Sequence, residues 1–181
     1  MTAKTILAIG CHNDDIELRC GGTLAKFAAA GARVIYVMMG RVDEPRAAER
    51  LGAVESIALG YAGFWNWNGA GGDASEKRRP LAGLDAFKAL RDEIRQLVLD
   101  KQPDLVLTHH GDDHHPDHYT VSKAVQRAVR QLAVEGRFRG ELWFWEPGGL
   151  AGNLPFVPTV GQDIAAWMTA KESALRFHVR Q

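Results

Sequence analysis

The chain of 181 residues lacks the features that mark charged, disulfide-rich or membrane-spanning proteins. It has only two cysteines, Cys11 and Cys20, too few for the disulfide framework of a small secreted domain. Its 22 Lys and Arg residues balance 22 Asp and Glu residues, so no net charge draws it to nucleic acid or acidic membranes. No apolar run of membrane-spanning length is present, and we expect no signal peptide because the N-terminus runs straight into a strand-like apolar run. We therefore expect a cytoplasmic protein with no nucleic-acid partner and no membrane insertion.

Short apolar runs alternate with helical patterns along the whole chain, with no internal repeat and no linker between them. We expect one domain over residues 1–181. Strands are predicted at 5–10, 33–39, 64–67, 104–108 and 140–145, and helices at 23–30, 43–59, 84–101, from 116 onward and at 164–177. Gly21 and Gly22 are interpreted as a turn before the first helix. The alternation predicts an α/β fold in which helices cover both faces of a mostly parallel sheet.

Two polar segments each follow a predicted strand. Residues 11–15 are Cys-His-Asn-Asp-Asp, and residues 114–118 are His-His-Pro-Asp-His. Because parallel sheets bind ligands at the carboxyl ends of their strands, we expect both segments to meet in one crevice. His12, Asp15 and His118 supply two imidazoles and one carboxylate, which leaves a tetrahedral zinc one open position for water. Iron, manganese or cobalt also suit such a mixed site.

The other polar residues of the two segments suit the hydrolysis of an amide. An open zinc site lowers the pKa of bound water to about 7 and polarises a carbonyl. Asp14, beside the ligand Asp15, is expected to accept a proton from that water. His115, one helical turn before His118, is expected to donate to the oxyanion or to the leaving amine. Asp117 is expected to hold His115 protonated and to fix its tautomer.

A less specific interpretation of these residues is that they are merely solvated. Five of the seven histidines lie between His109 and His118, and single loop histidines rarely act in catalysis. The joint placement of complementary ligands after two strands favours the metal site. Trp143 and Trp145 fall on one face of a predicted strand, and we interpret them as packing residues rather than a sugar platform.

These segments resemble a known family, the LmbE/PIG-L-like zinc deacetylases. Residues 9–25 are similar to its AHPDD(I/A)ExGCGGT signature, and residues 107–118 are similar to its second motif, which ends in HPDH. The resemblance implies a Rossmann-like three-layer sandwich and a zinc-dependent enzyme that removes the acetyl group from an N-acetylglucosamine-type sugar or conjugate. The implied zinc ligands are His12, Asp15 and His118, and the implied catalytic residues are Asp14, His115 and Asp117. Arg41 matches a position that contacts the sugar in relatives.

The chain departs from the family pattern at three places. Asn13 stands where proline is usual, the connection between Met39 and Glu44 is short, and the sequence stops at Gln181 where relatives continue. We therefore expect an open substrate mouth, and part of its wall could come from a neighbouring subunit of a homo-oligomer. Two alternative functions stay open, a sugar or nucleotide-sugar binding module without catalysis and an amidase for another amide conjugate.

Overall fold

The computed structural model describes residues 4–42, 44–63, 79–81, 83–146 and 156–178. Its central sheet has five parallel strands in the order β3-β2-β1-β6-β7. These strands are β1 Thr5–Gly10, β2 Arg33–Met38, β3 Ala53–Ala58, β6 Leu105–His109 and β7 Glu141–Trp145. Two short strands, β4 Tyr61–Ala62 and β5 Arg79–Pro80, pair separately.

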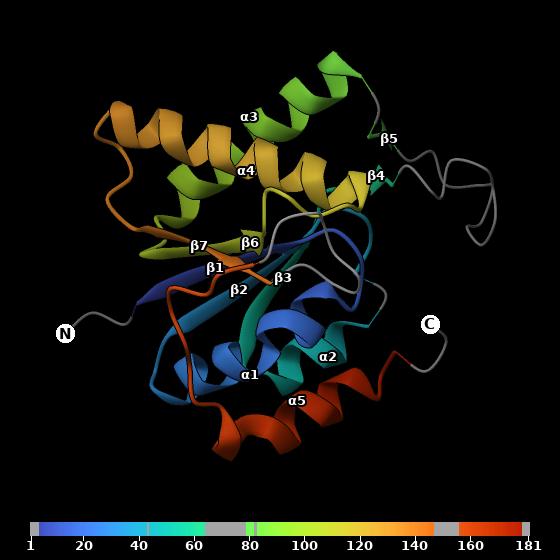
Figure 1. Cartoon of the computed structure of the whole chain (residues 1–181), viewed down its shortest axis with the longest axis vertical. Coiled ribbons are helices and arrows are strands. Elements are labelled where there is room, and N and C mark those ends of the chain that lie inside the picture. Colours follow the sequence, from blue (N-terminus) through green and yellow to red (C-terminus); the bar gives the residue numbers. More distant parts are fainter. Residues whose placement is uncertain (1–3, 43, 64–78, 82, 147–155, 179–181) are drawn as a thin grey trace.

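Helices cover both faces of the sheet (Figure 1). One layer contains α3 Leu84–Lys101 and α4 Pro116–Val134, and the other contains α1 Asp15–Ala29, α2 Pro45–Arg50 and α5 Met168–Leu175, preceded by the 3-10 turn η2 Ala165–Trp167. The predicted three-layer α/β fold is confirmed. No helix in the described part of the chain is long and apolar enough to span a membrane.

The central strand β1 divides the hydrophobic core into two layers. Leu7 and Ile9 pack on the side of α3 and α4, whereas Ile6 and Ala8 pack on the side of α1 and α2. This follows from the alternation of side chains along a strand, and it requires β1 to be apolar throughout. Burial of a Leu or Ile side chain of this kind contributes about 1.5–3 kcal/mol. The core therefore fixes β1, and with it the segment that follows Gly10.

The first helix begins earlier than predicted. It starts at Asp15, so Gly21 and Gly22 lie inside α1 and the predicted turn is wrong. The absence of a side chain at Gly22 lets Ile164 pack directly against α1, because a Cβ at position 22 would stand 2.6 Å from Cδ1 of Ile164. Glycine destabilises a helix interior by about 1 kcal/mol relative to alanine, which is why the sequence pattern suggested a turn.

The predicted helix at 43–59 is also wrong in its second half. Helix α2 ends at Arg50, Gly52 adopts a left-handed φ of +80°, and residues 53–58 form the edge strand β3. The exposed positions of β3 alternate with half-buried ones, and the half-buried Glu55 pairs with Arg33 on β2 at 2.8 Å. A half-exposed edge strand with this composition imitates a helix in sequence. The predicted strand at 64–67 lies outside the described residues.

Candidate metal centre

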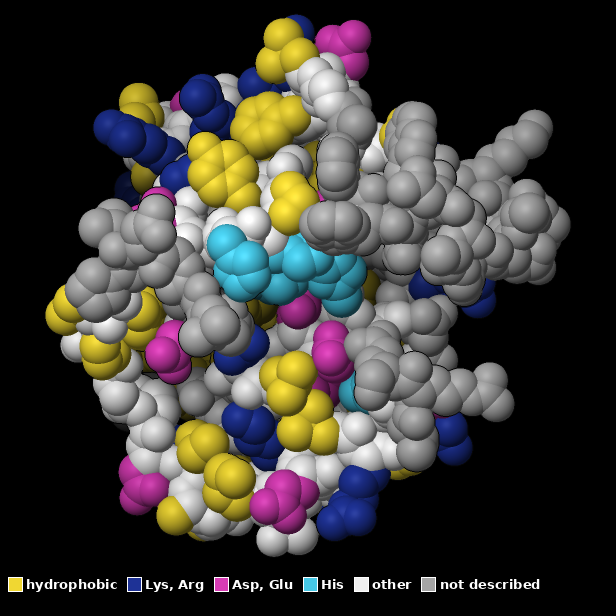
Figure 2. Space-filling model, turned by 45° about the vertical axis from the view of Figure 1, so that its right-hand side comes forward, with side chains coloured by type: hydrophobic (Ala, Val, Ile, Leu, Met, Phe, Trp, Pro, Cys, Tyr) yellow, Lys and Arg dark blue, Asp and Glu magenta, His cyan; other side chains and the backbone are white. Residues whose placement is uncertain are grey.

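The two polar segments meet because β1 and β6 are neighbours in the sheet. His12, just after β1, places its Nδ1 3.0 Å from Nε2 of His118, which lies in the first turn of α4. Asp15, the first residue of α1, lies 3.3 Å from His118 Nε2 through Oδ1 and 3.5 Å from His12 Nδ1 through Oδ2. Figure 2 shows histidine side chains gathered at the surface with acidic side chains directly beneath them. All three predicted ligands thus lie together.

The spacing of these donors fits a zinc ion. Nitrogens bound at 2.0–2.1 Å to a tetrahedral zinc are about 3.3 Å apart, close to the observed separations. Three overlapping donor sets lie within 4.8 Å, namely His12 with His115 and His118, Cys11 with His12 and Asp117, and Asp15 with His109 and His118. Burial raises the pKa of the Cys11 thiol to about 12. His12 and His118 each belong to two of these sets.

The charges at this point favour a cation. Burial alone would lower the pKa of His12, but hydrogen bonds to Asp117 and Asp15 outweigh it and raise the pKa to about 12. Burial also opposes the charge of His118, yet Asp113 and Asp15 raise its pKa to about 9. Burial would raise the pKa of Asp15, whereas contacts with the surrounding histidines hold it well below its usual value. The carboxylates therefore stabilise positive charge where a metal would be held.

Asp113 is a site residue that the sequence patterns did not reveal. It is 6% exposed, and Oδ2 lies 2.9 Å from Nδ1 of His118 while Oδ1 accepts the backbone N–H of His115 at 2.9 Å. A carboxylate on one ring nitrogen leaves the other nitrogen as the metal ligand. Asp113 therefore turns His118 Nε2 toward His12 and Asp15. The available signal was the run of acidic residues before His114, which resembles an ordinary solvated loop.

His109 is a second residue that the patterns missed. It is the last residue of β6, is 1% exposed, and places Nε2 3.2 Å from Oδ2 of Asp15. The indole N–H of Trp145, directly opposite on β7, lies 3.3 Å from its Nδ1. Burial lowers the pKa of His109. Strand alternation with Leu105 and Leu107 was the available signal that this histidine faces the interior.

His115 and Asp117 are arranged differently from the expected pair. Asp117 Oδ2 lies 3.3 Å from Nε2 of His12 and 4.0 Å from Nδ1 of His115. The backbone N–H of Asp117 donates to His115 Nδ1 at 3.2 Å, which caps α4. Burial, reinforced by the nearby charges of His118 and His12, lowers the pKa of His115. The direction of this shift is opposite to that expected for a histidine held protonated by a carboxylate.

The remaining predicted residues lie at the same edge of the sheet. Asp14 is half-buried at the N-cap position of α1, next to Asp15. Arg41 is exposed and follows the carboxyl end of β2. Both α1 and α4 begin at the cluster, and the partial positive charge of their N-termini favours the anionic forms of Asp15 and Asp117.

Gly63 closes one side of the cluster. A Cβ at this position would overlap Oδ2 of Asp117 and stand 3.6 Å from Nε2 of His12. Only a residue without a side chain allows the backbone to approach the two so closely. Gly63 follows the short strand β4, so its role depends on tertiary structure that no sequence spacing reveals.

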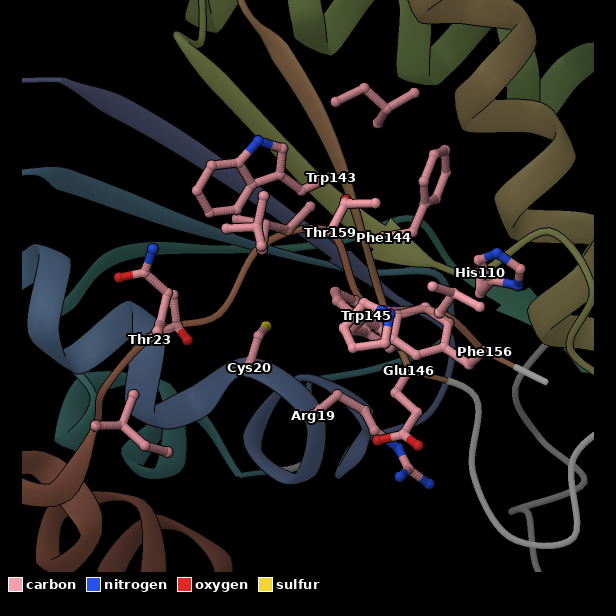
Figure 3. Close-up of a pocket in the computed structure, with 17 residues that line it drawn as sticks. Arg19, Cys20, Thr23, His110, Trp143, Phe144, Trp145, Glu146, Phe156 and Thr159 are labelled. Carbon is pink, nitrogen blue, oxygen red and sulfur yellow. The ribbon is translucent and has the colours of Figure 1, made fainter.

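A pocket of about 480 Å³ is lined in part by Trp145, the residue that contacts His109 (Figure 3). Its walls come from β7, α1 and residues 156–164, and they include Arg19, Trp143 and Phe156. The ring of His110 meets Phe156 edge-on with centroids 5.3 Å apart. Trp145 therefore contacts both this pocket and the histidine cluster.

Residues 7–129, which contain both polar segments, match the family PIG-L, described as GlcNAc-PI de-N-acetylase. The chain belongs to the PIG-L family. A relative in Escherichia coli K12, the uncharacterized deacetylase YaiS, is 32% identical over 190 residues, covering 97% of this chain and 90% of that protein. The predicted PIG-L membership is confirmed.

Another relative and one solved structure agree with PIG-L membership. The 1D-myo-inositol 2-acetamido-2-deoxy-alpha-D-glucopyranoside deacetylase of Mycobacteroides abscessus is 28% identical over 231 residues, covering 100% of this chain and 82% of that protein. The crystal structure of the conserved protein TT1542 from Thermus thermophilus has a TM-score of 0.72 and 25% identity, covering 97% of this chain and 79% of that one. The family is described as a de-N-acetylase, and the Mycobacteroides abscessus relative is named as a deacetylase of an acetamido sugar. This chain is accordingly a hydrolytic deacetylase.

Proposed function

We propose that this protein is a zinc-dependent deacetylase that hydrolyses the acetamido group of an N-acetylglucosamine-type sugar or conjugate. The observation that carries the proposal is the convergence of His12, Asp15 and His118 at the carboxyl ends of β1 and β6. Their family, and the deacetylase relatives with acetamido-sugar substrates, give the bond and the substrate class. Zinc fits the donor set of imidazole and carboxylate best, although other divalent ions share those ligands.

In this proposal His12, Asp15 and His118 hold the metal. The chemistry that zinc supplies when bound is polarisation of the acetyl carbonyl and acidification of a water molecule. Asp117 orients His12, because its carboxylate lies at Nε2 and leaves Nδ1 to face Asp15 and His118. Asp14, next to the ligands, accepts the proton of the attacking water.

His115 serves the developing charge on the acetyl oxygen. Its Nδ1 accepts a backbone hydrogen bond, so the proton of the neutral ring is on Nε2. The lowered pKa keeps the ring in this neutral donor form before reaction. His115 lies beside His12 and His118 in one donor set, and a preorganised N–H at such a place stabilises an oxyanion at little reorganisation cost. Arg41 is proposed to contact the sugar, beyond the end of β2.

The test is amine release from a panel of N-acetylated glucosamine conjugates, including N-acetylglucosaminyl-inositol and N,N'-diacetylchitobiose. We expect the zinc-loaded protein to release free amine and acetate in equal amounts, and His118→Ala to abolish the release. His114→Ala is the matched control, because the His114 side chain is 58% exposed and lies in the same segment. Ligand binding without amine release would instead support the sugar-binding module. Amine release only from conjugates other than acetamido sugars would support the amidase.

Three sequence predictions accompany this proposal. We propose one domain over residues 1–181, a cytoplasmic location and a homo-oligomer. Size-exclusion chromatography with light scattering tests the last of these, and a strictly monomeric active enzyme would contradict it.

A further inference from the structure

The indole of Trp145 determines where His109 carries its proton. An indole N–H can only donate a hydrogen bond, and this one lies 3.3 Å from Nδ1 of His109. The Nδ1 atom must therefore present its lone pair, and the ring proton is on Nε2. Both residues are buried, at 1% and 6% exposure, so no solvent competes for these atoms.

With its proton on Nε2, His109 donates to Asp15. The Nε2 atom lies 3.2 Å from Oδ2 of Asp15. The backbone N–H of His12 also donates to Oδ2, at 2.6 Å. The backbone N–H of Cys11 points between two acceptors, Oδ2 of Asp15 and Nε2 of His109, each 3.1 Å away. Because a protonated Nε2 cannot accept, the carboxylate is the acceptor in this arrangement. Oδ2 of Asp15 thus accepts two backbone hydrogen bonds and lies 3.2 Å from Nε2 of His109.

The other oxygen of Asp15 faces the metal-binding histidines. Oδ1 lies 3.3 Å from Nε2 of His118. The His109 ring stacks on His118 with centroids 4.0 Å apart, so it also limits how far that ligand can tilt. A carboxylate with one saturated oxygen can bind a metal through one atom only, which keeps the coordination number low and a position open for water.

We propose that His109 and Trp145 are positioning residues that make Asp15 a one-oxygen metal ligand. Trp145 fixes the His109 tautomer, His109 holds Oδ2 of Asp15, and Oδ1 is left for the metal. This inference rests on the proposed metal-dependent function. His109 acts through Asp15 and does not contact the substrate.

The first test observes the tautomer directly by nitrogen NMR of protein labelled with 15N-histidine. The His109 signals, identified by their loss in His109→Gln, should show a protonated Nε2 and an unprotonated Nδ1. Trp145→Phe should shift the Nδ1 signal, because the indole donor to that atom is lost. Trp143→Phe is the matched control, because its indole N–H donates to Glu141 at 2.7 Å. A protonated Nδ1 in the unaltered protein would overturn the proposal.

The second test measures the zinc dissociation constant by competition with a chromogenic chelator. Loss of an outer hydrogen-bond partner weakens metal binding by about 10–100-fold, which is the change expected for His109→Leu. His109→Gln, which retains an N–H donor, should stay close to the unaltered protein, and Trp145→Phe should fall between the two. Unchanged affinity in His109→Leu would overturn the proposal. Equal losses in His109→Gln and His109→Leu would do so too, because they would make His109 itself a ligand.

The two tests separate this inference from the proposed function. An unaltered protein that binds no zinc contradicts the proposed function, while its His109 tautomer still tests the hydrogen-bond chain. Zinc binding and amine release that are insensitive to His109→Leu contradict only the inference. If His109→Leu fails to fold, the NMR comparison of Trp145→Phe with Trp143→Phe still decides the result.

Discussion

Substitution of Gly63 by alanine should disable catalysis with little effect on folding. The new Cβ would overlap Oδ2 of Asp117, well inside the ordinary carbon–oxygen contact of about 3.3 Å. The backbone φ of Gly63 lies outside the left-handed region, so the alanine itself is unstrained. Relief of the overlap moves the Asp117 carboxylate by about 1 Å, and misplacement of that size costs about 100-fold in rate. A 100-fold loss corresponds to about 2.7 kcal/mol of transition-state stabilisation.

The assay compares kcat/KM for amine release with the thermal midpoint of the same samples. Gly40→Ala is the matched control, because its Cβ would stand 3.6 Å from the carbonyl oxygen of Tyr61 and 3.9 Å from that of Cys11, which are ordinary contacts. We expect Gly40→Ala to keep most activity and Gly63→Ala to lose about 100-fold at a similar midpoint. Equal activity in the two variants would refute the steric reasoning. A large fall in the midpoint of Gly63→Ala would show that folding, not Asp117, had changed.

Three further substitutions test the packing and the site. Gly22→Ala should destabilise the fold by about 1–3 kcal/mol, because its Cβ would stand 2.6 Å from the Ile164 side chain. Gly161→Ala is the control, because its Cβ would meet nothing within 4 Å. Equal denaturation midpoints for the two variants would contradict this expectation. The Tyr36 hydroxyl has no hydrogen-bond partner in the described part of the chain, so Tyr36→Phe should not lower the free energy of unfolding. Tyr61→Phe should lower it by about 1 kcal/mol, because the Tyr61 hydroxyl donates to a carboxylate of α3. A larger loss in Tyr36→Phe than in Tyr61→Phe, measured by chemical denaturation, would count against the described packing. Zinc at 100 times its dissociation constant should stabilise the unaltered protein by about 2.7 kcal/mol and should hardly stabilise His118→Ala. An equal zinc-induced shift of the thermal midpoint in both proteins would remove His118 from the ligand set.

The sequence predicted the parts of the fold that depend on local pattern. Runs such as residues 5–10 are apolar because both faces of a central parallel strand are buried, and a short run of this kind is typical of such a strand. The edge strand β3 was predicted as helix because one side of it is exposed and its residues suit either state. Gly22 was misread because its role is to admit Ile164, a contact between residues far apart in the chain.

At the site too, residues that follow a local sequence pattern could be predicted, and residues that depend on contacts between distant segments could not. His12, Asp15 and His118 were identifiable because each stands at a fixed distance from the end of a strand or the start of a helix. His109 and Trp145 face each other across two strands, and their relation depends on β6 and β7 being neighbours. No spacing within one segment contains that information. The residues that support the proposed metal site are therefore harder to predict than its proposed ligands.

The central claim is that the cluster around His12, Asp15 and His118 holds the metal on which deacetylation depends. Its most direct test is the rate of amine release from an acetamido-sugar substrate by protein stripped of metal, before and after one equivalent of zinc is added. We predict no release from the stripped protein and recovery at one equivalent. Equal release with and without metal would contradict the account.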